Sequence, residues 1–408
     1  MSKSHTLKEI QDILKNETKI KLSGSDIDGI TRGKVVNKDK AVKSLDAVDF
    51  YDPVTNLPLD SCPRGLLKKF VHKLSNLGYK GKVLFHLLSK RIYHKQTVEW
   101  SMNETPETLF HKKGVNLDPL TRGMFGYSVT RTTLNKEFFH EIYDRCLSFD
   151  IPIEGLHTET GPGVYEAALY YSDALNMADR AHLFKTTVKQ IGLEYGITSC
   201  FMAKPYNDLP GCSGHIHVSL ASLTSGENLF SAVGDTKNPL TLITPLMKNF
   251  LAGILLGLPS MMACYAPVIN SYKRLVENYW APVTVTYGFE NRTAAIRLIC
   301  PPLCPPSATR LEMRVTAIAA ILGSGLYGIE HNLELPFGPL EGDAVGKGER
   351  LPRNLKEASE TMKKKDSIAR KVFGDNFVDH FTSTRDHEWA LWERQVTSWE
   401  VSRYMETV

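Results

Sequence analysis

The sequence predicts an α+β fold with an antiparallel sheet, and three observations support this. Segments that alternate apolar and polar residues occur beside amphipathic helical segments. They lack the regular strand–helix–strand rhythm that is typical of a parallel sheet. Apolar residues make up 42% of the 408 residues and charged residues 23%, which indicates a globular chain with a substantial core. A chain of this length is expected to form roughly two or three domains.

The first third of the chain mixes helices and strands. We expect a short helix over residues 1–20, strands and loops over 21–60, and a helix over 63–77 that ends at Gly78. A further helix is expected near 135–149. Each helix is predicted from apolar residues at helical spacing or from a glycine at its end.

The rest of the chain follows the same mixed order. A strand, a Gly-Pro-Gly turn and a second strand are expected within "IPIEGLHTETGPGVYEAALYY", followed by an amphipathic helix over 172–195. "SCFMAKP" and "HIHVSL" are interpreted as strands, and 240–263 as a helix. Three short alternating strands are expected in "APVTVTYGF", "TAAIRLI" and "TRLEMRV", before a charged helical tail from about residue 354.

One apolar segment, residues 250–269, is long enough to cross a bilayer. Because Gly253, Gly257 and Pro259 interrupt it, we interpret it as a buried helix followed by a turn, and we expect no membrane partner. The seven cysteines are an odd, scattered set, which favours reduced thiols and a cytoplasmic protein. Cys300 and Cys304 are interpreted as parts of a loop.

The charge balance argues against a nucleic-acid partner. The formal net charge is only +4, from 49 basic and 45 acidic residues. A protein that binds nucleic acid or an acidic membrane broadly is expected to carry a larger basic excess.

Two histidines form the first candidate cluster. Strand alternation in "HIHVSL" places His215, His217 and Ser219 on one face. Taken alone, two polar residues on a solvated sheet face are the simpler explanation.

Two glutamates and a set of arginines favour a chemical role instead. Glu159 and Glu166 flank the Gly-Pro-Gly turn and could converge on a divalent cation, although exposed glutamates at strand ends are common. Arginine is suited to bidentate binding of carboxylate or phosphate. Together the clusters indicate phosphoryl transfer to a carboxylate, with no P-loop. The basic residues lie in three short motifs, as Arg274, Arg292, Arg297, Arg310 and Arg314, with Glu312 among them.

These motifs, in this order, resemble the glutamine synthetase family. The matching segments are "HTETGPGVYE", "FMAKP", "GCSGHIHVSL", "NSYKRL", "NRTAAIRL" and "RLEMRV". The resemblance runs from about residue 105 to the end of the chain and more weakly through 25–80. It implies a truncated N-terminal β-grasp-like domain over 1–60 and a catalytic domain over 61–408, whose curved antiparallel sheet forms a half-barrel flanked by helices.

The resemblance also implies roles for individual residues. ATP and Mg²⁺ (or Mn²⁺) are the implied cofactors, with Glu159 and Glu166 on one metal ion and His215 and Glu312 on the other. The nucleotide would be bound by His217, Ser219, Arg292 and Arg297. The catalytic residues, which hold glutamate and the transferred phosphate, would be Arg274, Arg292 and Arg314.

The sequence departs from the family pattern at the metal sites. The family has a Glu-x-Glu pair on an early strand, with one glutamate for each metal ion. The best fit places Thr97 and Glu99 at these positions, so that Glu99 is a metal ligand and one carboxylate is lost. A second register places His86 and Leu88 there and loses both.

Other departures concern the acceptor and the assembly. About 25 residues separate "DIDGITRGKVV" from "DSCPRGLLKK", so an N-terminal loop that reaches a neighbouring active site in the family is missing. Trp280 stands six residues after Arg274, where ammonia-using members have a flap glutamate. An aromatic wall there suits a larger amine.

We therefore expect an ATP-dependent ligase that forms a γ-glutamyl amide from glutamate and ammonia or, in preference, an amine. The family likeness implies a homo-oligomer. The alternative is a catalytically impaired member of the fold with a structural or regulatory role.

Overall fold

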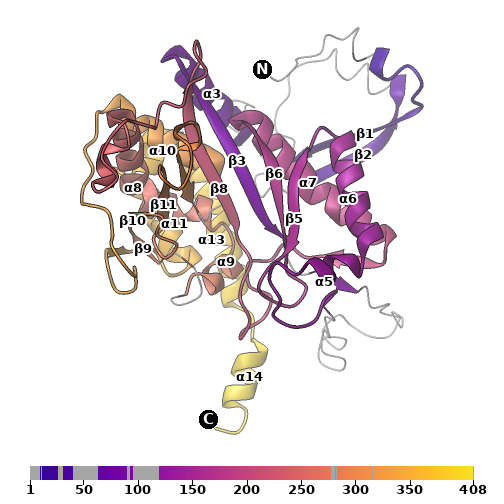
Figure 1. The fold of residues 1–408 in the computed structure, drawn as a ribbon. Helices are drawn as coiled ribbons and strands as arrows, with labels where there is room; N and C mark the ends of the chain where they lie inside the picture. Colours follow the sequence, from indigo (N-terminus) through magenta and orange to yellow (C-terminus); the bar gives the residue numbers. More distant parts are fainter. Residues whose placement is uncertain are drawn as a thin grey trace.

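A computed structural model of the chain describes residues 10, 12–25, 31–39, 63–89, 92–94, 119–276, 281, 283–313 and 317–407. Its central element is a seven-stranded sheet with the order β10-β11-β12-β8-β3-β6-β5. All neighbours are antiparallel except β10 and β11, which are parallel. The long strands lie side by side at the centre of the molecule (Figure 1). The seven strands are β10 (Tyr287–Phe289), β11 (Ile296–Ile299), β12 (Arg310–Met313), β8 (Gly214–Ser222), β3 (Tyr79–Ser89), β6 (Tyr165–Asp173) and β5 (Ile153–Thr158).

Helices pack against the sheet and against one another. α7 (Ala174–Glu194) contacts β3 and β6, as well as α3 (Pro63–Asn76) and α6 (Lys136–Ser148). α10 (Ile318–Glu330) joins α3 to α8 (Pro245–Tyr265). The remaining helices are α5 (Val129–Thr133), α9 (Ile269–Arg274), α11 (Leu355–Lys363), α12 (Ile368–Phe373), α13 (Asp375–Glu393) and α14 (Ser398–Tyr404), with single turns at Pro239–Thr241 and Pro306–Ala308.

The core lies on one face of β8. Ile216, Val218 and Leu220 are fully buried in the same apolar cluster as residues of α7, α8 and α10. Because side chains alternate along a strand, His215 and His217 project from the other face. The apolar face holds the fold together, and the polar face is available to a site.

Most of the apolar segment over residues 250–269, which is long enough to cross a bilayer, belongs to the helix α8. It is long and apolar enough to cross a bilayer, but 72% of its most apolar window is buried inside the protein. The helix runs unbroken past Gly253, Gly257 and Pro259. A Cβ on Gly253 would lie 2.1 Å from the carbonyl oxygen of Ser324 in α10, so the glycine allows the two helices to pack closely. α8 is therefore a core helix, as predicted.

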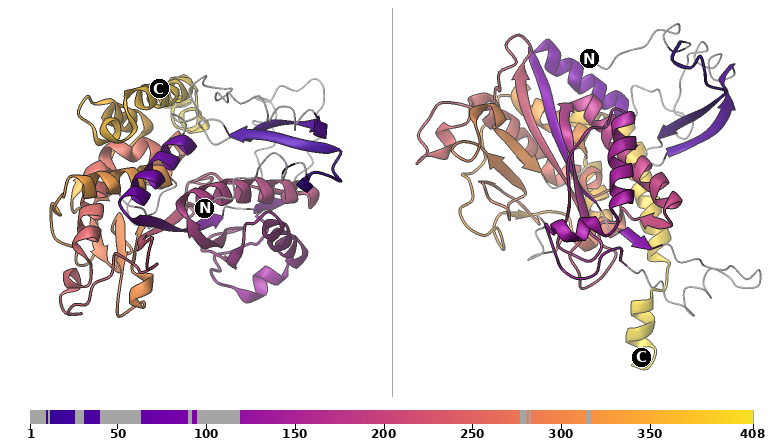
Figure 2. Two further views of the ribbon diagram at one scale, coloured as in Figure 1. Left: turned by 90° about the horizontal axis from the view of Figure 1, so that it is seen from above. Right: turned by 45° about the vertical axis from the view of Figure 1, so that its right-hand side comes forward.

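Three smaller sheets lie outside the main one. β1 (Lys19–Ser25) and β2 (Thr31–Asn37) form an antiparallel hairpin, which lies apart from the main body in all views (Figures 1 and 2). β4 (Ile92–His94) pairs with β7 (Ile197–Ser199), and β9 (Thr284–Val285) pairs with β13 (Glu349–Arg350). The β-grasp-like domain over 1–60, the catalytic domain over 61–408 and the half-barrel curvature stay predictions.

Most predicted elements are confirmed, and two predictions are wrong. The helix predicted over 63–77 is α3, and Gly78 after it has a positive φ of 83°. The strand predicted for "SCFMAKP" is wrong, because β7 ends at Ser199. The backbone there bonds elsewhere: Cys212 donates to the carbonyl of Ala203 at 2.7 Å, and the Asn270 side chain bonds both backbone groups of Lys204. The parallel β10–β11 pair is the exception to the predicted antiparallel sheet.

Candidate active site

The turn between β5 and β6 brings the two predicted metal-binding glutamates together. Gly161 and Gly163 adopt φ values of 129° and 66°, which favour glycine, and Glu159 N–H donates to the carbonyl of Val164 at 2.8 Å. Glu166 follows on β6 and is buried. The Gly-Pro-Gly segment therefore folds the chain back so that both carboxylates reach the same place.

A histidine that the sequence analysis did not single out completes this cluster. Nε2 of His157 lies 3.4 Å from an oxygen of Glu159 and 3.3 Å from an oxygen of Glu166. One ligand atom from each of the three residues lies within 4.8 Å of the others. His157 stands two residues before Glu159, so strand alternation could have predicted that it shares the face of that carboxylate.

The environment favours a positive charge on His157. Contacts with the carboxylates, of Glu159 first and of Glu166 second, raise the pKa of the imidazole to about 9 against the effect of partial burial. Tyr127 stacks on the imidazole with ring centroids 4.3 Å apart and an angle of 13° between the rings. Burial first, and then the charges of Glu159 and Glu166, raise the pKa of the Tyr127 phenol. The cluster is thus a pair of carboxylates with one cationic partner.

Among the predicted nucleotide-binding arginines, Arg292 is exposed on the loop before β11. Its charge lowers the pKa of the Tyr127 phenol, against the larger effects of burial and of the carboxylates. The charge of Arg292 therefore reaches Tyr127, the residue that stacks on His157.

A second group of charged residues lies on β8, β11 and β12. Glu312 on β12 is directly opposite His217 on β8 and Arg297 on β11. One oxygen of Glu312 lies 3.4 Å from Nδ1 of His215, and the other accepts a hydrogen bond from Arg297 at 3.0 Å. The Glu312 side chain is only 4% exposed, so these cationic or polar neighbours offset the cost of its burial.

Two more contacts orient the predicted phosphate-binding groups. Arg310 donates from Nε to Nδ1 of His217 at 3.1 Å and from Nη1 to the carbonyl of Ala308 at 2.8 Å. Since Nδ1 accepts, the neutral ring of His217 carries its proton on Nε2. Arg297 also donates to Glu290 from Nε at 3.0 Å. Ser219 follows on the same face of β8 and is half-buried.

The strand register places the two groups on one face of the sheet. Ala168 on β6 and His215 on β8 are both opposite position 86 of β3. Directly opposed residues in an antiparallel sheet project from the same face, and Glu166 is two residues from Ala168. The predicted metal, nucleotide and phosphate residues of β6, β8, β11 and β12 therefore face one side.

Arg274 lies at the end of α9 and is buried. The backbone of Gly211 packs directly on it: a Cβ at that position would lie 2.2 Å from Cδ of Arg274 and 2.6 Å from the carbonyl oxygen of Ala203. The first glycine of "GCSGHIHVSL" thus leaves room for the predicted glutamate-binding arginine.

Some predicted residues lie outside the described residues. These are Glu99 and Thr97, Arg314, and Trp280. The backbone of β3 is described, and it places position 88, a leucine, opposite Glu166, and position 86, a histidine, opposite His215. β3 therefore lies between the two groups of charged residues. In the second register described above, the positions of the Glu-x-Glu pair on this strand are occupied by His86 and Leu88.

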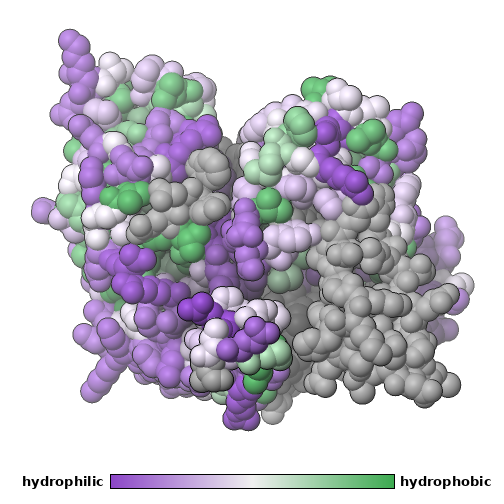
Figure 3. Space-filling view, turned by 90° about the horizontal axis from the view of Figure 1, so that it is seen from below, coloured by the Kyte–Doolittle hydropathy of each residue, from purple (hydrophilic) through white to green (hydrophobic). Residues whose placement is uncertain are grey.

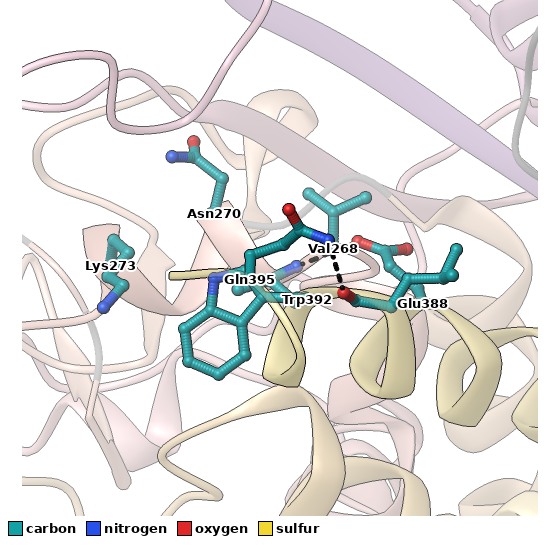
Figure 4. Close-up of a pocket in the computed structure, with 8 residues that line it drawn as sticks. Val268, Asn270, Lys273, Glu388, Trp392 and Gln395 are labelled. Atoms are coloured by element: carbon teal, nitrogen blue, oxygen red, sulfur yellow. Dashed lines mark hydrogen bonds between the residues drawn. The ribbon is translucent and has the colours of Figure 1, made fainter. Parts of the chain in front are cut away.

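The surface offers a hollow and a separate pocket. The face seen from below is hollowed between two lobes, with hydrophilic residues on both sides (Figure 3). A pocket of about 540 Å³ lies elsewhere, between α9 and the end of α13, and includes Lys273, Glu388 and Trp392 (Figure 4). Glu388 accepts a hydrogen bond there from the backbone of Ile269 at 3.3 Å. This pocket includes none of the residues predicted to bind metal, nucleotide or glutamate.

The residues of the first cluster fit a divalent cation. Two carboxylates and an imidazole converge, with Nε2 of His157 buried 3.4 Å from an oxygen of Glu159 and 3.3 Å from an oxygen of Glu166. Oxygen ligands suit Mg²⁺ and Mn²⁺, and the imidazole suits a transition metal.

The chain is similar to known proteins along most of its length. The family described as glutamine synthetase, catalytic domain, matches residues 60–404. The type-1 glutamine synthetase 2 of Dictyostelium discoideum is 39% identical over 98% of this chain and 87% of its own length. The glutamate–isopropylamine ligase of a Pseudomonas species is 33% identical over 86% of this chain and 75% of its own. The solved structure of apo GmaS has the same fold, with a TM-score of 0.77, 24% identity, and coverage of 98% of this chain and 99% of that one.

Proposed function

Because the chain belongs to the glutamine synthetase family, we propose that it joins the γ-carboxylate of glutamate to an amine, in preference to ammonia, through a γ-glutamyl phosphate. Membership makes it a ligase that uses ATP, either a glutamine synthetase or a glutamate–amine ligase. The observation that carries the choice of an amine is Trp280 at the position of the expected flap glutamate. Without that carboxylate, an ammonium ion would lose its expected base, and an aromatic ring favours an apolar amine substituent.

The geometry of the acidic cluster supports the phosphoryl-transfer step. Glu159, Glu166 and His157 would hold a divalent cation beside the nucleotide. When bound, such a cation neutralises charge on the phosphate oxygens. Glu166 is buried, so its position is held by the sheet and not by solvent-exposed rotamers. A preorganised site of this kind needs little rearrangement when charge moves.

The arginines support the binding of two anions. The charge of Arg292 affects Tyr127 beside the acidic cluster, and Arg297 and Arg310 extend from neighbouring strands of the same face. Guanidinium groups at these positions suit the phosphates of ATP. Arg274 is buried beside the loop that carries Gly211, where it suits a carboxylate of glutamate.

A coupled ADP-release assay tests the proposal. Glutamate, ATP and Mg²⁺ would be supplied with ammonia, ethylamine or a polyamine, and we expect a higher kcat/KM for one of the amines. Trp280→Glu should shift the preference towards ammonia, while Trp399→Glu, on the exposed face of α14, should not. A wild-type preference for ammonia would contradict the proposal. No turnover together with weak ATP binding by calorimetry would instead support the impaired, structural alternative.

We also propose that the chain is a homo-oligomer, as its family likeness implies. Light scattering coupled to size-exclusion chromatography would measure this directly, since the monomer mass is 45.7 kDa. A single monomeric peak at micromolar concentration would contradict it.

A further inference from the structure

The neighbours of Glu166 in the sheet differ in the atoms that they offer to a metal ion. On β3 its directly opposed position is 88, a leucine, which is a residue type without a ligand atom. On β5 its directly opposed residue is His157. Among the described residues opposite Glu166, the donor for a cation at this carboxylate therefore comes from the β5 side, where Glu159 also lies.

The imidazole of His157 is held in a ligand-like position. Its Nε2 is buried and lies 3.4 Å from a carboxylate oxygen of Glu159 and 3.3 Å from one of Glu166. Tyr127 stacks on the ring and restricts its rotation. The backbone of Tyr127 is itself anchored by a 2.6 Å hydrogen bond from its N–H to the carbonyl of Thr158, beside the histidine.

We propose that His157 is a ligand of the cation bound by Glu159 and Glu166, so that an imidazole joins the two carboxylates in the described part of this site. The inference rests on the proposed function only in requiring that a cation binds there. An imidazole donor adds little to the binding of Mg²⁺ and more to the binding of a transition metal. The site should therefore discriminate in favour of Mn²⁺ over Mg²⁺ more strongly than a site of three carboxylates.

Pulsed electron paramagnetic resonance tests the ligand directly. Mn²⁺ would be added to the full chain without glutamate, ATP or amine, and modulation of the electron spin echo by ¹⁴N would be recorded. Because His215 is predicted to bind the other metal ion, the test is made in a His215→Gln background. We expect coupling to an imidazole nitrogen in His215→Gln and its loss when His157→Gln is added. Adding Glu166→Gln instead, which removes the anchoring carboxylate and keeps His157, should lose the same signal. Coupling that is absent from His215→Gln, or unchanged when His157→Gln is added, would overturn the inference.

Metal affinity gives a second readout. By calorimetry we expect His157→Gln to weaken Mn²⁺ binding by roughly 10- to 100-fold and Mg²⁺ binding by much less. Equal losses for the two ions would contradict an imidazole–metal bond. If the variant that carries His157→Gln does not fold, the comparison of His215→Gln with His215→Gln/Glu166→Gln still decides the result.

The outcome is separable from that of the ligase assay. Nitrogen coupling without amine-dependent ADP release would support the metal site and contradict the proposed function. Amine-dependent ADP release without nitrogen coupling would support the proposed function and contradict the role of His157.

Discussion

Glu312 accepts a hydrogen bond from Nη1 of Arg297 at 3.0 Å, across adjacent strands of the sheet. The second oxygen of the same carboxylate lies 3.4 Å from Nδ1 of His215. A predicted metal ligand and a predicted phosphate ligand therefore form an ion pair with each other. A cation bound at Glu312 would compete with this guanidinium, which also donates to Glu290.

Removal of the Arg297 charge should destabilise the fold. In Arg297→Met the buried Glu312 keeps His215 as its one remaining ion-pair partner among the described residues. Breaking a buried ion pair from one side costs about 3 kcal/mol or more in the free energy of unfolding. Urea unfolding would measure the change. Arg403→Met, at an exposed position of α14, should stay within about 0.5 kcal/mol of the wild type. Equal stability of the two variants would show that Glu312 does not depend on Arg297.

Loss of the buried carboxylate should impair catalysis. Glu166→Gln keeps the shape of the side chain but removes a predicted metal ligand, so amine-dependent ADP release should fall by at least about 100-fold. The matched control is Glu154→Gln, an exposed glutamate of β5, which should retain near wild-type rates. A Glu166→Gln enzyme with near wild-type activity would remove this carboxylate from the site.

A methyl group at Gly211 should disturb glutamate binding. In Gly211→Ala the new Cβ meets Cδ of Arg274 and the carbonyl of Ala203, so the arginine must shift. We expect the KM for glutamate to rise more than kcat falls, with a loss of about 1–3 kcal/mol in unfolding free energy from overpacking. Gly155→Ala is the matched control, since a Cβ there meets nothing within 4 Å. An unchanged KM would indicate that Arg274 does not position glutamate.

The metal-free protein should lose stability as the pH rises. The pKa of His157 is raised from 6.5 to about 9, so the folded state binds the proton more tightly than the unfolded state does. This stabilisation is fully present below about pH 6.5 and is lost as the pH passes through 9. With EDTA present, the Tm difference between wild type and His157→Gln should therefore shrink between these pH values. A constant difference would show that the imidazole is not charged beside the two glutamates.

Local patterns in the sequence determined which residues share a face and where the chain turns. Alternation along "HIHVSL" placed His215 and His217 opposite the buried Ile216 and Val218, because a strand has a period of two. The Gly-Pro-Gly segment could be interpreted as a turn, because glycine tolerates positive φ. Chemistry-bearing residue types in a fixed order were enough to indicate the family.

Only the tertiary structure decided which of these residues meet. The contact of Arg297 with Glu312 and that of Arg310 with His217 depend on the order and register of β11, β12 and β8. Neither is encoded by spacing along the chain, because pairing between strands is set by burial of the whole sheet against its helices. The pairing of β3 with β6 places a leucine position, and not a carboxylate, opposite Glu166. The pairing of β5 with β6 places His157 opposite the same glutamate, with Nε2 3.3 Å from its carboxylate.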